Sequence, residues 1–219
     1  MKYFLAILFF CFCACHCHAQ TKVYTGKING KYEIEMHLRT FGKETYGYYF
    51  YKTQNKPIPL HAKQNGYKIK LLEGDETENN VFFDGALNGK SFKGYWRNVT
   101  AKKTLPFSLT EIKTEKTDAE KAKYSGIYKI FGNDKEKTLD IKYINDKYFY
   151  FEISLGSSTC TGYINGIAET QTTGQGTYHD EGCKQLSFTF KDRSAEITED
   201  SCDGYHGSAC EFSGTYPKK

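Results

Sequence analysis

The stretch KYEIEMHL, residues 31–38, alternates between apolar and polar side chains. Its apolar residues Ile34, Met36 and Leu38 share one face of an extended chain, opposite its glutamates and histidine. A period of two residues is typical of a β-strand that is buried on one face only. Asn29-Gly30 stands just before this stretch, and Asn-Gly is the strongest short-range signal of a tight hairpin. The sequence therefore predicts a strand that follows a hairpin turn.

Similar runs precede and follow this strand at intervals of about 8 to 12 residues, the spacing of an all-β sandwich or barrel. Asn-Gly recurs between them, at Asn65-Gly66 and Asn88-Gly89. The runs of the first half are KVYTGKI, KYEIEMHL, TYGYYFYK, IPLHAKQ, YKIKLLE, VFFDGAL, SFKGYW and TLPFSLTEI.

The alternation breaks at TEIKTEKTDAEKAK, residues 110–123, which is charged and has no aromatic residue. It contains Thr117 and, three positions later, Glu120, the pattern of a helix-capping box. We therefore expect a linker with a short helix at 113–123.

The alternating pattern then restarts and continues to the end of the chain. The runs of the second half are YSGIYKIF, KTLDIKYI, KYFYFEISL, CTGYINGIAE, GTYHD, KQLSFTFK, SAEITE and CEFSGTY.

Two short motifs occur once in each half. YTG at 24–26 is matched by YSG at 124–126, and SFKGYW at 91–96 is matched by EFSGTY at 211–216. An internal repeat of about 100 residues explains both matches. Glycine within a strand is typical of a tight bend or a close approach of two backbones, as barrel corners require.

The predicted fold class is all-β, with two tandem eight-stranded antiparallel up-and-down barrels of calycin or lipocalin type. The first barrel spans 20–112 and the second spans 124–219. Closure of eight strands removes the sheet edges that promote aggregation. A pair of β-sandwiches and one large barrel are the alternatives.

Residues 1–19 have the order of a secretory signal peptide: Lys2, then an apolar run from Tyr3 to Ala14, then small residues. The run is shorter than the roughly 20 residues that a membrane-spanning helix needs. We expect export to the periplasm or outer membrane, with cleavage after Ala19. Lipoprotein processing, with a lipid anchor at Cys15, is the alternative.

Four cysteines follow the leader, and all are in the last third of the chain: Cys160, Cys183, Cys202 and Cys210. An even number in an exported chain predicts two disulfides. In an up-and-down barrel the third, fifth and seventh connections lie at the same end, so all four should meet at one rim. Of the three pairings, we favour Cys160–Cys183 with Cys202–Cys210.

The same rim collects polar residues that are candidates for a binding surface: His179, Asp180, Glu181, Asp203, Tyr205 and His206. A rigid loop on a scaffold is a common place for binding residues, although such loops are also often simply solvated. A metal site formed by the two histidines and the carboxylates lacks a recognised ligand spacing. We expect neither a metal nor a cofactor.

The two halves differ in charge. Residues 20–116 contain 17 Lys and Arg against 10 Asp and Glu, a net charge of +7, whereas residues 117–219 contain 12 against 16, a net charge of −4. The acidic half could attract a cationic partner at low salt. Scattered basic residues in an exported chain do not favour nucleic acid.

The sequence does not favour an enzyme. It contains no G-x-S-x-G, no H-E-x-x-H, no phosphate-binding loop and no dinucleotide fingerprint. Of the four histidines beyond the leader, His37 and His61 fall in strands, where we expect them to be structural or exposed.

The run CTGYINGIAE…GTYHDEGCKQLSFTF…AEITEDSC…HGSACEFSGTY resembles small exported β-barrel modules of Gram-negative bacteria, some of them grouped with periplasmic lysozyme inhibitors. The first half is similar to an exported bacterial domain of the form G-x-I-x-G…G-x-Y-x-Y…F-x-G-x-W…LPF-x-L. Together the resemblances cover most of the chain after the leader. The shared residues are glycines, aromatics and cysteines, and the inhibitory loop of such inhibitors has no match here.

The resemblance implies an exported envelope protein that binds a protein or glycan through the rim of the second barrel, as an inhibitor of a cell-wall hydrolase such as lysozyme. An acidic second half suits a cationic lysozyme.

The alternative is a carrier of a small apolar ligand in a barrel lumen. YGYYFY at 46–51 and YFYF at 148–151 place aromatic residues on both strand faces, so one face must pack on the other barrel, a partner or a sugar.

Overall fold

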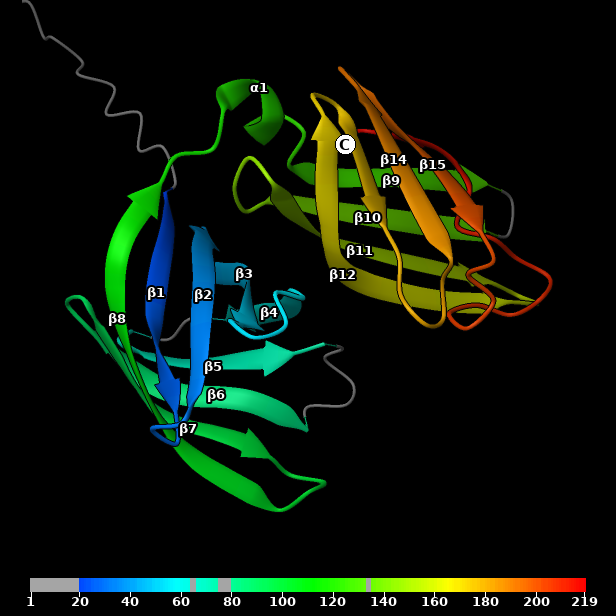
Figure 1. The fold of residues 1–219 in the computed structure, drawn as a ribbon. Helices are drawn as coiled ribbons and strands as arrows, with labels where there is room; N and C mark the ends of the chain where they lie inside the picture. Colours follow the sequence, from blue (N-terminus) through cyan, green and yellow to red (C-terminus); the bar gives the residue numbers. More distant parts are fainter. Residues whose placement is uncertain (1–19, 64–65, 75–79, 133–134) are drawn as a thin grey trace, which may run out of the picture.

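A computed structural model describes residues 20–63, 66–74, 80–132 and 135–219. The predicted signal peptide at 1–19 and the alternative lipid-anchor site at Cys15 lie outside the described residues. The predicted fold class is confirmed: the chain forms two antiparallel sheets of eight strands each, one closed into a barrel and one nearly closed (Figure 1). In the described part of the chain, no helix combines the length and the hydrophobicity needed to cross a membrane.

The first barrel is a meander in which each strand pairs with its neighbours in sequence. Its strands are β1 (Thr21–Ile28), β2 (Tyr32–Phe41), β3 (Glu44–Tyr51), β4 (Ile58–Lys63), β5 (Lys68–Glu73), β6 (Val81–Asn88), β7 (Ser91–Asn98) and β8 (Lys103–Glu115). Strand β1 pairs with both β2 and β8, which closes the sheet. Asn29 and Gly30 both have positive φ, 53° and 64°, as a two-residue hairpin between β1 and β2 requires.

The second barrel has the same order of neighbours. Its strands are β9 (Gly126–Gly132), β10 (Lys135–Tyr143), β11 (Tyr148–Ser157), β12 (Thr161–Thr172), β13 (Gln175–Tyr178), β14 (Gln185–Lys191), β15 (Ser194–Asp200) and β16 (Gly214–Pro217). Strand β9 meets the chain just after β16, at an isolated bridge between Tyr128 and Lys218, and the sheet is not fully closed.

Between the barrels, helix α1 (Ala119–Ala122) is short, as predicted. Strand β8 extends to Glu115, three residues into the range expected for the linker. The helix is capped by Asp118, whose Oδ1 accepts a hydrogen bond from the Glu120 backbone N–H at 3.0 Å. The predicted cap, Thr117, instead donates its hydroxyl to the carbonyl of Ile144 at 3.2 Å. Its side chain therefore joins the linker to the second barrel.

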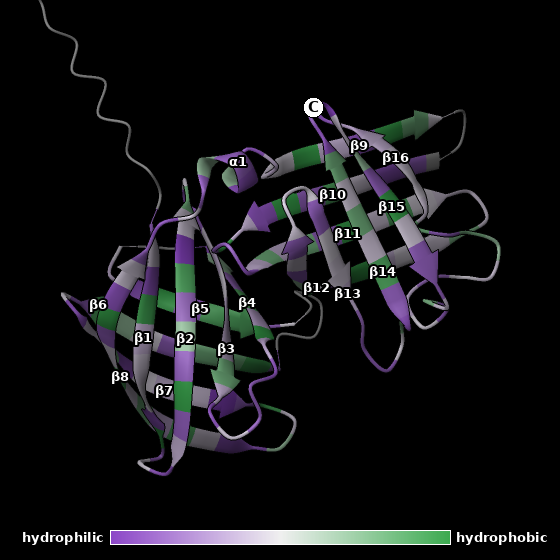
Figure 2. Cartoon of the chain, turned by 45° about the horizontal axis from the view of Figure 1, so that its top comes forward, coloured by the Kyte–Doolittle hydropathy of each residue, from purple (hydrophilic) through white to green (hydrophobic). Residues whose placement is uncertain are grey.

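Both lumens are filled by side chains. Ile34, Met36 and Leu38 are buried in the first barrel, as the alternation predicts, and hydrophobic and hydrophilic residues alternate along the strands (Figure 2). The second core is rich in aromatic rings, such as Phe149 and Phe151, which are fully buried. Close packing of this kind leaves the lumens occupied by the protein itself.

The glycines of the two matched motifs play different roles. Gly94 of SFKGYW lies in the seventh strand of its barrel opposite Gly85, and a Cβ there would lie 2.1 Å from the carbonyl oxygen of Asp84. Gly214 of EFSGTY begins the eighth strand of its barrel and has φ +151°. The two motifs thus occupy non-equivalent strands. Gly94 allows a close approach of two backbones, and Gly214 adopts a positive φ.

Outer-face aromatic residues of β3 and β11 pack between the two barrels. Tyr48 of the first barrel joins Ile144, Tyr150 and Ile167 of the second in one buried cluster. Asn145 donates its amide to the hydroxyl of Tyr48 at 2.9 Å. The outer aromatic face predicted from the sequence is therefore the contact between the barrels.

Two histidines and an arginine are buried where the strands of the first barrel meet the second barrel. His37 and His61 are 5% and 6% exposed, and Arg39 is 7% exposed. Arg39 donates to the carbonyl of Tyr143 in the second barrel at 3.0 Å. The two histidines were expected to be structural or exposed, and both are buried.

Candidate functional site

Three connections of the second barrel meet at one end and are cross-linked there. They are the β11–β12, β13–β14 and β15–β16 connections, and we call residues 157–161, 178–185 and 200–213 the stapled rim. One disulfide joins Cys160 to Cys210 and the other joins Cys183 to Cys202, with Cα–Cα separations of 6.1 and 3.8 Å. Disulfides persist in oxidising compartments, so the two bridges indicate that the protein resides in one.

The rim location of the cysteines is as predicted, but the predicted pairing is wrong. Cys183 precedes β14 by two residues, and Cys202 follows β15 by two residues. Because Gln185 pairs with Asp200, the register places these two cysteines opposite each other. The long β15–β16 connection then crosses the rim, where His206 bridges to Gly162, and brings Cys210 to Cys160.

Asp180 is the centre of a hydrogen-bond network that holds two of the rim connections together. Its carboxylate accepts from the Tyr178 hydroxyl at 2.5 Å and from the Tyr205 hydroxyl. It also accepts from the backbone N–H groups of Gly182 and Cys183, each at 2.9 Å. Partial burial disfavours the charged carboxylate, but these four hydrogen bonds outweigh it and lower the pKa of Asp180 below its usual value.

The long β15–β16 connection is fixed by a second carboxylate. Glu199 accepts from the backbone N–H of Phe212 at 2.7 Å, and its other oxygen lies 3.0 Å from Nε2 of His206. The His206 side chain is 3% exposed, and its ring meets Phe212 edge to face at 5.0 Å. His206 therefore holds the connection in place and has little surface to offer a partner.

The six predicted rim residues thus divide into two sets. Asp180, Tyr205 and His206 are engaged in the internal bonds described above, whereas His179, Glu181 and Asp203 are exposed at the surface.

Two further residues near the rim are exposed and were not among the predicted candidates. Glu211 is exposed within the long β15–β16 connection. Phe131, near the end of β9, is 72% exposed. The sequence did contain a signal for Phe131. In YKIF, Tyr128 and Ile130 share the inner face of the strand, so the alternation places the Phe131 ring on the outer face.

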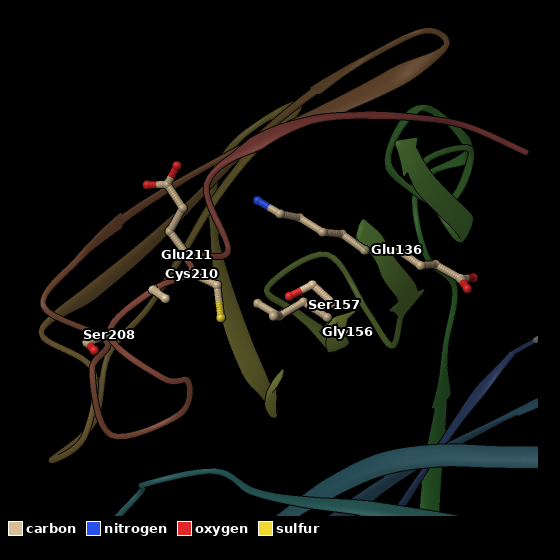
Figure 3. A pocket seen from close by; sticks show the side chains of 9 residues that line it. Glu136, Gly156, Ser157, Ser208, Cys210 and Glu211 are labelled. Atoms are coloured by element: carbon tan, nitrogen blue, oxygen red, sulfur yellow. The ribbon is translucent and has the colours of Figure 1, made fainter. Parts of the chain in front are cut away.

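A hollow of about 290 Å³ lies beside the Cys160–Cys210 bridge (Figure 3). Cys210 and Glu211 lie on one side of it, and Gly156 and Ser157 lie across from them. The other residues that line it are Glu136, Lys137, Leu155, Ser208 and Ala209. Its walls are mostly small and polar, unlike a deep apolar pocket for a small ligand.

Among the residues that the structure describes, no three His, Cys, Asp or Glu side chains are arranged to hold a metal ion. His179 and His206 therefore do not come together with the rim carboxylates in such a group. Comparison with protein-family models, curated proteins and solved structures found no match for this chain.

Proposed function

We propose that this protein is an exported binding protein of the periplasm or outer membrane that engages a cationic cell-wall hydrolase, such as lysozyme, through the stapled rim. The observation that carries the proposal is the cross-linking of three separate connections by two disulfides at one end of the barrel. A surface that is already ordered loses little conformational entropy when it binds.

The charge of the exposed rim favours a cationic partner. Glu181, Asp203 and Glu211 are exposed, while the exposed Lys184 lies 2.5 Å from Asp200 and offsets its charge. Complementary charge across an interface accelerates association and excludes partners of the wrong sign. The resemblance to lysozyme-inhibitor modules points in the same direction.

Phe131 gives this surface an apolar anchor. It pairs across the β9–β10 hairpin with Glu136, which lines the hollow beside the Cys160–Cys210 bridge. Exposed aromatic rings are enriched among the residues that dominate binding energy in interfaces. We therefore place Phe131 at the edge of the proposed contact.

Lumenal binding of an apolar ligand is less well supported. Aromatic and aliphatic side chains fill both barrels. Glu73, a half-buried carboxylate of the first barrel, already accepts from Tyr49 at 2.9 Å and Trp96 at 2.7 Å.

Calorimetric titration with hen-type lysozyme at low salt tests the proposal. We expect saturable binding by the native protein and about tenfold weaker binding by the triple variant Glu181→Gln, Asp203→Asn, Glu211→Gln. The loss should shrink as salt is added, because exposed charges are screened.

The matched control removes three carboxylates elsewhere: Glu120→Gln, Asp192→Asn and Glu196→Gln, whose side chains are 68%, 90% and 45% exposed. This variant has the same net charge as the rim variant and should bind like the native protein. Absence of binding by the native protein, or equal weakening by both variants, would contradict the proposal.

A further inference from the structure

A groove of about 670 Å³ runs between the two barrels, away from the hollow beside the Cys160–Cys210 bridge. Glu35 and Phe50 line it from strands of the first barrel, and the second barrel lines it with Asp146 and Lys147 of the β10–β11 connection and with Tyr148 at the start of β11. A second hollow of about 400 Å³ shares Asn55 and Tyr148 with it and extends to Pro57, Ile167 and His179. The two hollows adjoin at Asn55 and Tyr148.

Stacked rings form one wall of the groove. The His37 ring stacks on Tyr48 with centroids 4.6 Å apart and planes 13° apart, and Phe50 lies 6.2 Å from His37 at 29°. Tyr148 meets Tyr48 edge to face at 5.0 Å. Whereas His37 and Tyr48 are buried, Phe50 and Tyr148 are only half-buried, so their rings can be reached from the groove.

The polar groups of the groove are mixed in sign and kind. Glu35 lies 2.9 Å from Nε2 of His37, and Glu115 lies 3.4 Å from Nδ1. The Glu115 contact lacks hydrogen-bond geometry, so within the described part of the chain this buried Nδ1 atom makes no hydrogen bond. Lys116 and Lys147 offset much of the acidic charge of the lining. A strongly charged ligand is therefore not favoured.

We propose that this groove binds a glycan chain of β-linked pyranose units. Such sugars present flat C–H faces that stack on aromatic rings, and hydroxyl groups that exchange hydrogen bonds with carboxylates, amides and ammonium groups. Half-buried rings beside mixed polar groups, in two adjoining hollows, provide both kinds of contact.

An extended peptide fits this groove less well. Peptides that bind in extended form commonly add a strand to a free sheet edge. Strands β2 and β3 are each paired on both sides, and so are β10 and β11, which flank the groove across from them. Their backbone groups are therefore already used within the barrels.

Cellotetraose and chitotetraose are the probes, titrated into the complete exported protein and followed by nuclear magnetic resonance. We expect saturable shifts confined to Asn55, Phe50, Tyr148 and their neighbours. Phe50→Leu keeps the apolar volume but removes the flat ring, and should weaken binding about tenfold.

The control is Tyr95→Leu, which removes a half-exposed ring on β7 of the first barrel and should leave the affinity unchanged. The proposal is overturned if neither probe binds at millimolar concentration, if shifts map elsewhere, or if both variants bind equally. Shifts at Phe50 produced by a flexible tetrapeptide but by neither sugar would assign the groove to peptides instead.

Discussion

Replacing Cys160 and Cys210 with alanine is expected to lower the free energy of unfolding of the second barrel by about 4 kcal/mol. The bridge joins residues separated by 50 positions, and closing a loop of that length restricts the unfolded chain by about this amount. The bridge between Cys183 and Cys202 spans 19 positions, and its removal should cost about 3 kcal/mol. Both losses are large beside the stability of a typical domain.

Urea denaturation measures these losses, and the chain allows the barrels to be followed separately. The one tryptophan, Trp96, is in β7, so its fluorescence reports the first barrel, whereas circular dichroism reports both. Each double variant should shift the circular dichroism transition more than the fluorescence transition. An unchanged transition, or a greater loss from the shorter loop, would contradict the assignment.

Asp180→Ala is expected to destabilise the second barrel by about 3 kcal/mol, because it removes the acceptor of four hydrogen bonds at once. Two of the donors are backbone N–H groups of the β13–β14 connection, and in the variant they would have to hydrogen-bond to water instead. The exposed Asp203 provides the control, since Asp203→Ala should change stability by less than about 0.5 kcal/mol. In thermal melts, the melting temperature of Asp180→Ala should therefore be clearly lower than that of Asp203→Ala.

The effect of Asp180 should also depend on pH. Because folding lowers the pKa of this carboxyl, its contribution is fully present above the ordinary aspartate pKa of about 3.9 and is lost as pH falls through the lower, folded value. The stability difference between the native protein and Asp180→Ala should thus be constant near neutrality and shrink in acid below about pH 4. A difference that grows on acidification would show that the carboxylate is not the stabilising group.

The strands of both barrels were predictable because their side chains alternate in the sequence itself. Ile34, Met36 and Leu38 show this directly, since each occupies the inner face that the period of two assigns. The Cys183–Cys202 bridge was also within reach. If β14 and β15 form a hairpin, Gln185 pairs with Asp200 at its open end. Cys183 and Cys202 each lie two positions beyond that pair, so they face each other.

Other features depend on contacts between distant parts of the chain. His37 falls on the polar face of its strand, and the strand pattern does not show that Glu35, Tyr48 and Glu115 surround its ring. Tyr205 and Asp180 are 25 positions apart, and nothing local predicts that a tyrosine hydroxyl will donate to this carboxylate. Three of the six predicted rim residues therefore proved to be internal supports.

Mass-spectrometric mapping of the disulfides in the unreduced protein tests the account most directly. Trypsin alone leaves Cys160 and Cys183 in one peptide, because no Lys or Arg lies between them, so cleavage at acidic residues is needed. Glu169 and Asp203 provide sites that separate both pairs of neighbouring cysteines. We predict peptides that link Cys160 to Cys210 and Cys183 to Cys202; links from Cys160 to Cys183 and from Cys202 to Cys210 would contradict the stapled rim.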